Sequence, residues 1–145
     1  MEKAYRDFGH DVDNTDTLLE AGLGFTCDFT KEGGFVGDEA VLAQKANGPL
    51  SKRLLQVLVT DPDPMMYHGE IVYRNGVVVG DIRAASYGHT LGGSVGLSMV
   101  ETDSGPINKR FVDDATWEVD IAGTRYPARV SLRPMYDPKN ETIKQ

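Results

Sequence analysis

The 145-residue chain has one cysteine, one tryptophan and no long apolar run. A single cysteine excludes an internal disulfide framework and a zinc site built from cysteines. No apolar stretch approaches the ~20 residues of a membrane-spanning helix, and Met1-Glu2-Lys3 does not begin a signal peptide. The absence of repeats and biased tracts excludes collagen-like, coiled-coil and low-complexity classes. We therefore expect a globular protein in a reducing compartment.

Positive charge is also scarce, because 15 Lys and Arg residues face 22 Asp and Glu residues and the net charge is −7. Nucleic acids and anionic membranes bind surfaces with clustered Lys and Arg residues, so we predict neither as a partner. The balance still allows a local basic pocket for a small anionic ligand.

The first third of the chain combines helical and strand patterns. Side-chain oxygens in residues 14–17 predict the cap of a short helix over residues 18–21. Strict alternation over residues 25–30 predicts a strand with Cys27 on its apolar face, as a core residue rather than a nucleophile. Residues 38–46 predict a second helix, with acidic residues in the first turn.

The middle of the chain is typical of antiparallel strands. Residues 53–60, 70–74, 77–83 and 95–100 are apolar or alternating. Asn75-Gly76 predicts a hairpin, because a two-residue type I′ turn needs positive φ at both positions.

The last third predicts a loop over residues 102–116 and another hairpin, formed by residues 117–121 and 126–133. A turn at Gly123-Thr124 would place Glu118 opposite Arg129 and Asp120 opposite Pro127. One face of the hairpin would be apolar, made by Trp117, Val119, Ile121, Ala128, Val130 and Leu132.

Two residue types on the second strand of this hairpin carry further expectations. Pro127 indicates a sheet edge, since it cannot donate to a ladder. Arg129 and Arg133 form a stripe that faces an anionic ligand or, as the simpler alternative, pairs with Glu118 across the strands.

These patterns predict a mainly β fold of the α+β class. Residues 50–145 would form an antiparallel barrel, because closure removes exposed strand edges. Residues 1–49 would form a short helix-containing segment that packs on the barrel, since one helix and one strand cannot enclose a core.

The residues show no catalytic constellation of their own. His10, His68 and His89 are far apart and lack the spacing of a helical metal site, and His68 is the best of them for ligand contact. Neither a nucleophile elbow nor a phosphate-binding loop is present. We predict no catalytic residue and no metal ligand within the chain.

Several short sequence motifs, in the same order and along nearly the whole chain, resemble those of the glycine-cleavage T-protein family of folate-dependent aminomethyltransferases. The Glu-Lys-x-Tyr-Arg form at the start resembles the branch fused to dimethylglycine and sarcosine dehydrogenases. The motifs are Glu2-Lys3-Ala4-Tyr5-Arg6, Gly9-His10-Asp11, residues 17–23, residues 34–40, residues 75–82, residues 86–91 and Tyr136-Asp137-Pro138.

The resemblance implies a C-terminal piece of a longer enzyme that transfers a one-carbon unit to tetrahydrofolate. Residues 1–49 would end the folate-binding body, and residues 50–145 would be the terminal barrel. In this family the upstream body supplies an essential aspartate and much of the pterin pocket, and in the fused enzymes also a flavin domain. We therefore expect no turnover and no flavin binding by this chain alone, in a bacterial cytoplasm or a mitochondrial matrix.

The resemblance also implies two binding residues. Glu2 matches the acidic residue that contacts the pterin ring, where a carboxylate can accept two adjacent N–H donors. Lys52 or Arg53 matches a basic residue near the glutamyl tail, and Arg53 is our candidate. The upstream body is the expected partner.

Two other interpretations stay open. The barrel could brace a catalytic body, or it could belong to a regulatory relative that docks a partner without catalysis. The apolar residues Phe25, Phe29 and Phe35 further predict a homodimer.

Overall fold

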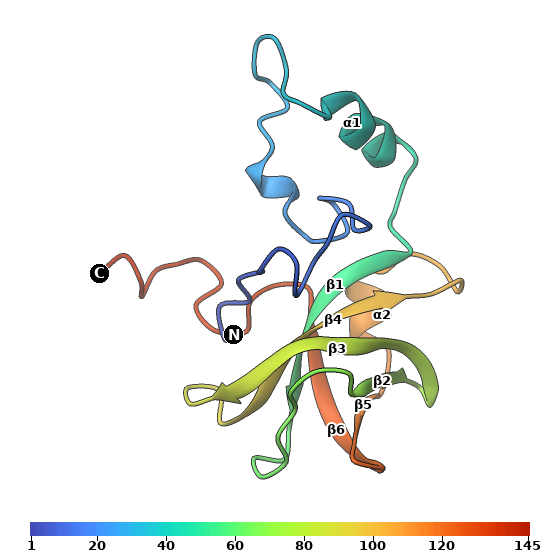
Figure 1. Cartoon of the computed structure of the whole chain (residues 1–145), viewed down its shortest axis with the longest axis vertical. Coiled ribbons are helices and arrows are strands. Elements are labelled where there is room, and N and C mark those ends of the chain that lie inside the picture. Colours follow the sequence, from blue (N-terminus) through green and yellow to red (C-terminus); the bar gives the residue numbers. More distant parts are fainter.

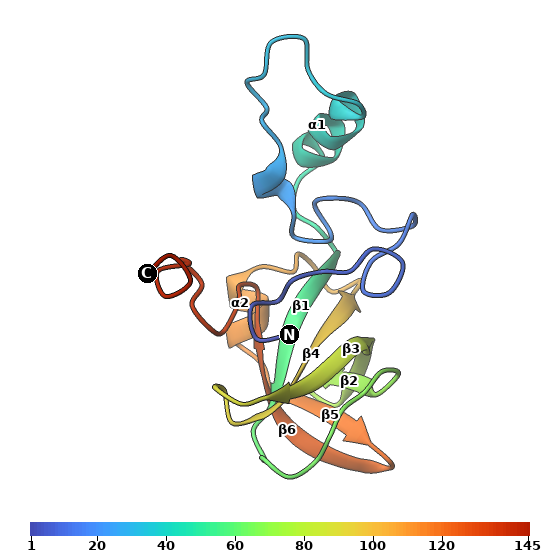
Figure 2. The same cartoon turned by 60° about the vertical axis from the view of Figure 1, so that its left-hand side comes forward.

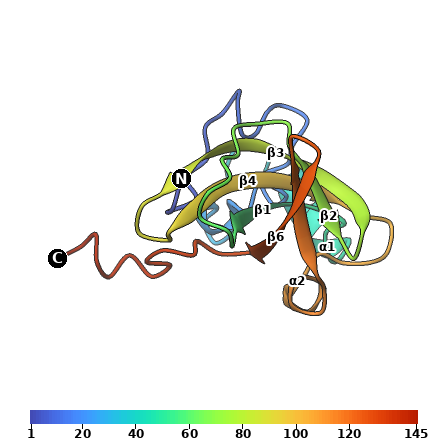
Figure 3. The same ribbon diagram turned by 90° about the horizontal axis from the view of Figure 1, so that it is seen from below.

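The computed structural model describes all residues from 1 to 145, and a closed antiparallel barrel of six strands forms its lower half (Figure 1). Seen from below, the strands curve around a common axis (Figure 3). Their order around the barrel is β1-β4-β3-β2-β5-β6. The strands are β1 Lys52–Val59, β2 Ile71–Arg74, β3 Val77–Gly88, β4 Gly93–Glu101, β5 Trp117–Ile121 and β6 Thr124–Ser131. The mainly β fold and the predicted barrel are confirmed.

The barrel interior holds the main hydrophobic core. Leu55, Val57 and Val59 alternate along β1 and point inward, as period-two burial requires. A short helix, α2 (Lys109–Asp113), adds Phe111, whose ring packs edge to face on Trp117 with centroids 5.9 Å apart. Burial of this apolar surface is the principal stabilising contribution to the barrel.

Residues 1–50, here the upper segment, contain α1 (Asp38–Ala46) and a 3-10 turn, η1 (Gly24–Thr26). α1 lies above the barrel, whereas the N-terminus lies beside the strands (Figures 1 and 2). A second apolar cluster attaches this upper segment to the barrel. Its buried members are Ala4, Val12, Ala21, Leu54, Leu97 and Met99. Because the upper segment covers part of the outer barrel wall, β4 is buried on both faces from Gly93 to Val100. No helix of the chain has the length and apolar character needed to cross a membrane.

The predicted hairpin at Asn75-Gly76 is confirmed. Asn75 and Gly76 have φ angles of 49° and 78°, and the strands on either side pair as Arg74 with Val77. The Asn75 side chain also accepts the backbone N–H of Thr116 at 2.9 Å, which joins this turn to the start of β5. The predicted helix over residues 38–46 is confirmed as well.

The strand predicted over residues 25–30 is wrong. No neighbouring strand pairs with it, and local hydrogen bonds replace a ladder: Thr26 donates to the Leu23 carbonyl, and Asp28 accepts from Thr30. Cys27 is partly exposed instead of buried in a core.

The helix predicted over residues 18–21 is shortened to a single turn. Thr17 and Glu20 form the reciprocal contacts of a capping box, with Thr17 Oγ1 accepting the Glu20 N–H and Glu20 accepting the Thr17 N–H. Gly22 at φ 70° ends the turn before a helix forms. The predicted loop of residues 102–116 likewise contains α2, which Asn108 caps.

The predicted register of the last hairpin is also wrong. The turn residues are Ala122 and Gly123, with φ of 52° and 84°, so Glu118 faces Pro127 and Asp120 faces Arg125. The sequence hid this turn because alanine is rarely found in the left-handed region.

The face predicted to be apolar is nevertheless the inner one. Trp117 and Val119 are buried, and Ile121, Ala128, Val130 and Leu132 pack against them. The edge position predicted from Pro127 is wrong, because β6 pairs with both β5 and β1 in the closed barrel.

Candidate functional site

The carboxylate of Glu2 lies against the turn that joins β3 to β4. Its Oε1 accepts the backbone N–H groups of Thr90 and Leu91, each at 2.8 Å. The approach is close, since a Cβ added at Gly88 would lie 3.0 Å from the same oxygen. Glu2 therefore sits at a fixed place on the barrel surface.

The environment keeps Glu2 ionised at neutral pH. Burial raises its pKa, but the hydrogen bonds from Leu91 and Thr90 outweigh that effect, so the pKa lies below its ordinary value of 4.5. Oε2 makes no hydrogen bond within the chain and can accept from a ligand.

A shallow aromatic hollow of about 320 Å³ surrounds this carboxylate. Its aromatic residues are Tyr5, Tyr87, His89 and Tyr136, and the rings of Tyr87 and His89 meet edge to face at 5.2 Å. Aromatic side chains beside a carboxylate suit a flat, hydrogen-bonding ring.

A larger cleft of about 710 Å³ opens between the upper segment and the barrel. Five cationic residues line it and no Asp or Glu does, although the chain as a whole is acidic. The cationic residues are Lys3, Arg6, Lys45, Arg53 and Arg133. Lys3 and Tyr5 line both hollows, so the cleft and the Glu2 carboxylate are neighbours.

Arg53 on β1 is a cleft cation without a carboxylate partner. It is half-buried and forms no ion pair, and burial lowers its pKa below the ordinary value. Burial lowers the pKa of Arg6 as well; Asp11 raises it and the charge of Arg53 lowers it further. Two guanidinium groups thus repel each other in a cleft that lacks a carboxylate, which is the arrangement expected of an anion site.

The structure separates the two basic residues that the sequence left as alternatives. Consecutive residues of a strand point to opposite faces, so Arg53 faces the cleft and Lys52 turns away from it. The Lys52 Nζ lies 2.7 Å from Oδ1 of Asp16, whose side chain is fully buried. Lys52 is therefore a structural ion-pair partner, and Arg53 remains the candidate for ligand binding.

The other residues considered from sequence lie outside this site or at its margin. His10 and His68 are exposed, whereas His89 lines the aromatic hollow. No three His, Cys, Asp or Glu side chains gather in a metal-binding arrangement. Arg129 is exposed and forms no ion pair; the register shift removes it from Glu118.

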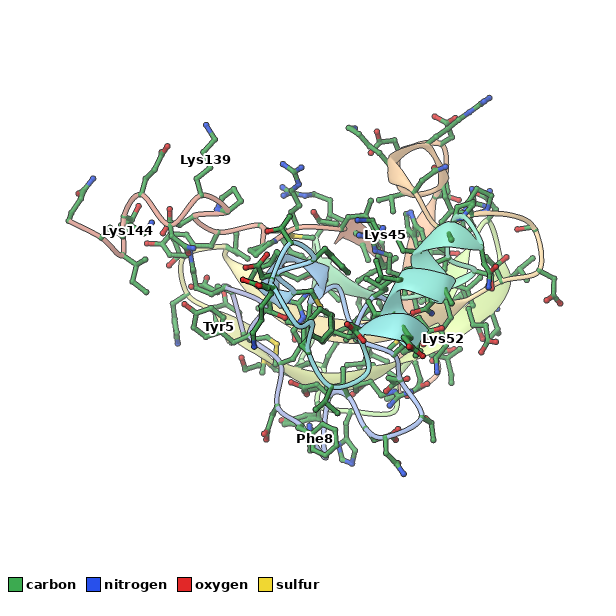
Figure 4. All side chains as sticks on the ribbon, turned by 90° about the horizontal axis from the view of Figure 1, so that it is seen from above. Tyr5, Phe8, Lys45, Lys52, Lys139 and Lys144 are labelled. Carbon is green, nitrogen blue, oxygen red and sulfur yellow. The ribbon has the colours of Figure 1, made fainter.

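Sequence reasoning missed three residues of the cleft, namely Arg6, Lys45 and the tail residue Asn140. Arg6 lies in the same sequence motif as Glu2, residues 2–6, and this motif could have identified it as a site residue. Lys45 sits on α1 over the Phe29 ring at 4.2 Å, and nothing in its local sequence distinguishes it from a surface lysine. In the view from above, Lys45 lies at α1, while Phe8 projects outward at the rim (Figure 4).

Fold and site together define a small β-barrel domain whose candidate site sets one ionised carboxylate beside a cleft whose charged lining residues are all cationic. Comparison with known families supplies the particular assignment. The family model described as "Glycine cleavage T-protein C-terminal barrel domain" matches residues 52–137, and the chain belongs to this family. The resemblance predicted from sequence is confirmed.

The relatives cover almost the whole chain. A 4-methylaminobutanoate oxidase (formaldehyde-forming) from Paenarthrobacter nicotinovorans is 42% identical over 99% of this chain. The mitochondrial sarcosine dehydrogenase of Mus musculus is 36% identical, also over 99% of this chain. In both cases the chain spans 16% of the relative's length.

Two further matches are a solved structure and a second mitochondrial protein. The crystal structure of the glycine cleavage system aminomethyltransferase T from Bartonella henselae superposes with a TM-score of 0.72 at 20% identity, over 90% of this chain and 35% of that one. The mitochondrial pyruvate dehydrogenase phosphatase regulatory subunit of Mus musculus is 33% identical over 93% of this chain and 16% of its own length.

Proposed function

We propose that the chain is the C-terminal part of a folate-dependent aminomethyltransferase-like protein, which transfers a one-carbon unit to tetrahydrofolate in glycine cleavage or in dimethylglycine or sarcosine oxidation. The observation that carries the proposal is the Glu2 carboxylate, with one oxygen free, beside a cleft whose charged lining residues are all cationic. Family membership agrees with it.

Glu2 suits the pterin end of tetrahydrofolate. A pterin presents adjacent N–H donors on its pyrimidine edge, and an ionised carboxylate offers about four acceptor positions. Two of these are used by Thr90 and Leu91, so the two on Oε2 remain for the ring. Tyr5, Tyr87 and Tyr136 would contact the ring faces or edges.

Arg53 suits the opposite end of the ligand. The glutamyl tail carries carboxylates, and a guanidinium binds a carboxylate through two parallel hydrogen bonds. A ligand anion at Arg53 would also relieve its repulsion with Arg6. The carboxylate of the site would thus meet the neutral, N–H-donating pterin ring, and its cations would meet the anionic glutamyl tail.

The chain's contribution to the reaction is orientation and electrostatics. Tetrahydrofolate supplies the nitrogen that accepts the one-carbon unit. Glu2 and Arg53 would bind the two ends of tetrahydrofolate and so hold this nitrogen in a fixed position for the transfer. By analogy with the family, we propose that the aspartate that handles the proton belongs to the upstream body, which would be the partner of this chain. The chain alone would be inactive and would not hold a flavin. We place the protein in a bacterial cytoplasm or a mitochondrial matrix.

Calorimetric titration of tetrahydrofolate tests this proposal, in the chain and in the full-length protein that contains it. Glu2→Gln and Arg53→Gln should each weaken binding about tenfold or more, as expected for the loss of a charge-assisted contact. Arg129→Gln is the matched control, because it removes an exposed guanidinium on β6 outside the cleft. Unchanged affinity in both site variants would refute the assignment.

A non-catalytic role is the second candidate, as a bracing or regulatory barrel that docks a partner. The match to a protein named as a phosphatase regulatory subunit favours it. In this case tetrahydrofolate would not bind to the full-length protein, and formation of methylenetetrahydrofolate would be absent.

A further inference from the structure

Gln56 is a buried amide that joins both ends of the chain to the barrel. It is 3% exposed and lies on β1, on the outer face between Leu55 and Val57. Its Nε2 donates to the carbonyls of Met1 and Glu2 at 3.1 and 3.0 Å. Its Oε1 accepts the backbone N–H of Met135 at 2.6 Å.

A second contact ties the same two segments together. Lys3 Nζ donates to the carbonyl of Asp137 at 2.6 Å and to Asn140 Oδ1 at 2.6 Å, and pairs with the Asp137 carboxylate at 3.1 Å. Figure 1 shows the C-terminal tail leaving the barrel beside the N-terminus. Two sets of contacts therefore fix the backbone around Glu2. One is the Gln56 amide on β1, and the other is the contact of Lys3 with the C-terminal tail.

From these contacts we propose that Gln56 is a positioning residue for Glu2: its amide fixes the backbone from which the Glu2 side chain reaches the β3–β4 turn. The inference rests on the proposed function, in which Glu2 binds the pterin ring. Gln56 itself lines neither hollow and does not touch the ligand.

The chemistry of the position requires an amide. Two carbonyls face donors and one N–H faces an acceptor around this buried side chain, and a neutral amide supplies two N–H donors and an acceptor oxygen at once. A glutamate would keep the contact with Met135 but would set its oxygens against the carbonyls of Met1 and Glu2. A methionine of similar size would leave the Glu2 carbonyl and the Met135 N–H without these partners, and the Met1 carbonyl would keep only the Ala4 N–H, at 2.8 Å.

The first test needs no ligand and follows the Glu2 carboxylate and the Thr90 and Leu91 amides of the chain by NMR during an acid titration. In Gln56→Met the pKa of Glu2 should return toward its ordinary value, and the two amides should stop reporting its titration. Trp117→Phe is the matched control: it breaks a buried hydrogen bond, to the Val112 carbonyl at 2.9 Å, elsewhere in the barrel and should leave Glu2 unchanged.

Asp137→Asn extends this test if Gln56→Met does not fold. It weakens the tail contact without altering the barrel interior, and it should shift the Glu2 titration in the same direction by a smaller amount. An unaltered Glu2 titration in the folded variants would overturn the inference.

The second test is a double-mutant cycle on tetrahydrofolate affinity in the full-length protein. Gln56→Met should weaken binding on the order of tenfold when Glu2 is present, and should have no further effect in the Glu2→Gln background. An equal loss in both backgrounds would show a purely structural role and refute positioning. If the wild-type protein does not bind tetrahydrofolate, the proposed function fails, and the NMR result alone decides the role of Gln56.

Discussion

Lys52 and Arg53 are adjacent in the chain, yet only Lys52 has a carboxylate partner. Its Nζ lies 2.7 Å from Asp16, while Arg53 faces a cleft without a single acidic residue. The alternation of side chains along β1 therefore separates a structural cation from a ligand-facing one.

The Lys52–Asp16 pair should stabilise the attachment of the upper segment. The hydrogen bond to Asp16 raises the pKa of Lys52 above 10.5, so the contribution is fully present below pH 10.5 and is lost as the pH rises through the raised value. Asp16→Ala should lower the free energy of unfolding by about 2 kcal/mol at pH 7. It should also flatten the alkaline decline in stability, as measured by urea denaturation. Equal stability of the variant and wild type would contradict this.

Arg53→Met should stabilise the chain in the absence of a ligand, because it removes a half-buried charge that repels Arg6. We expect a gain of about 0.5 to 1 kcal/mol in denaturant unfolding. The same variant should bind tetrahydrofolate more weakly in the full-length protein, so stability and binding change in opposite directions. A destabilised variant would show that Arg53 contributes mainly through packing of its alkyl stem.

Binding of tetrahydrofolate should weaken in acid through Glu2. Its folded-state pKa is depressed, so the ionised form persists at and above pH 4.5 and is lost as the pH falls through the lowered value. Affinity measured by fluorescence between pH 3.5 and 7 should decline only at the acid end, at roughly the lowered pKa. Glu2→Gln should remove this dependence, and an unchanged acid decline in that variant would assign it to another group.

The turn between β5 and β6 should gain stability from Ala122→Asn. Ala122 occupies the left-handed region at φ 52°, where asparagine is favoured and where Asn75 already sits in the other hairpin. We expect an increase of about 1 kcal/mol in the free energy of unfolding. Asn75→Ala provides the converse control and should destabilise, since it also loses the contact to Thr116. A lower melting temperature for Ala122→Asn would be inconsistent with this turn.

The exposed apolar residues of the upper segment still predict a homodimer of the isolated chain. Phe25 is 81% exposed, whereas Phe29 and Phe35 pack edge to face with centroids 6.2 Å apart. Size-exclusion chromatography with light scattering should give a dimer mass, and Phe25→Ser should reduce it to a monomer. A clean monomer for the wild type would disprove the expectation.

The barrel was predictable because its strands carry the period-two pattern locally, and Asn75-Gly76 specifies its turn by residue type alone. The strand expected around Cys27 failed for a non-local reason: alternation gives a strand only when a partner lies alongside. The Glu118 register failed because the turn uses an alanine where the rule expects glycine or asparagine. Glu2 and Arg53 came from family resemblance, and Gln56 was invisible in sequence because its partners lie about 55 and 79 residues away.

The contact between Lys3 and Asp137 brings the start of the upper segment and the C-terminal tail to one spot on the barrel surface. Because these two segments meet at one spot, a change in the tail is transmitted through Lys3 to the backbone that carries Glu2.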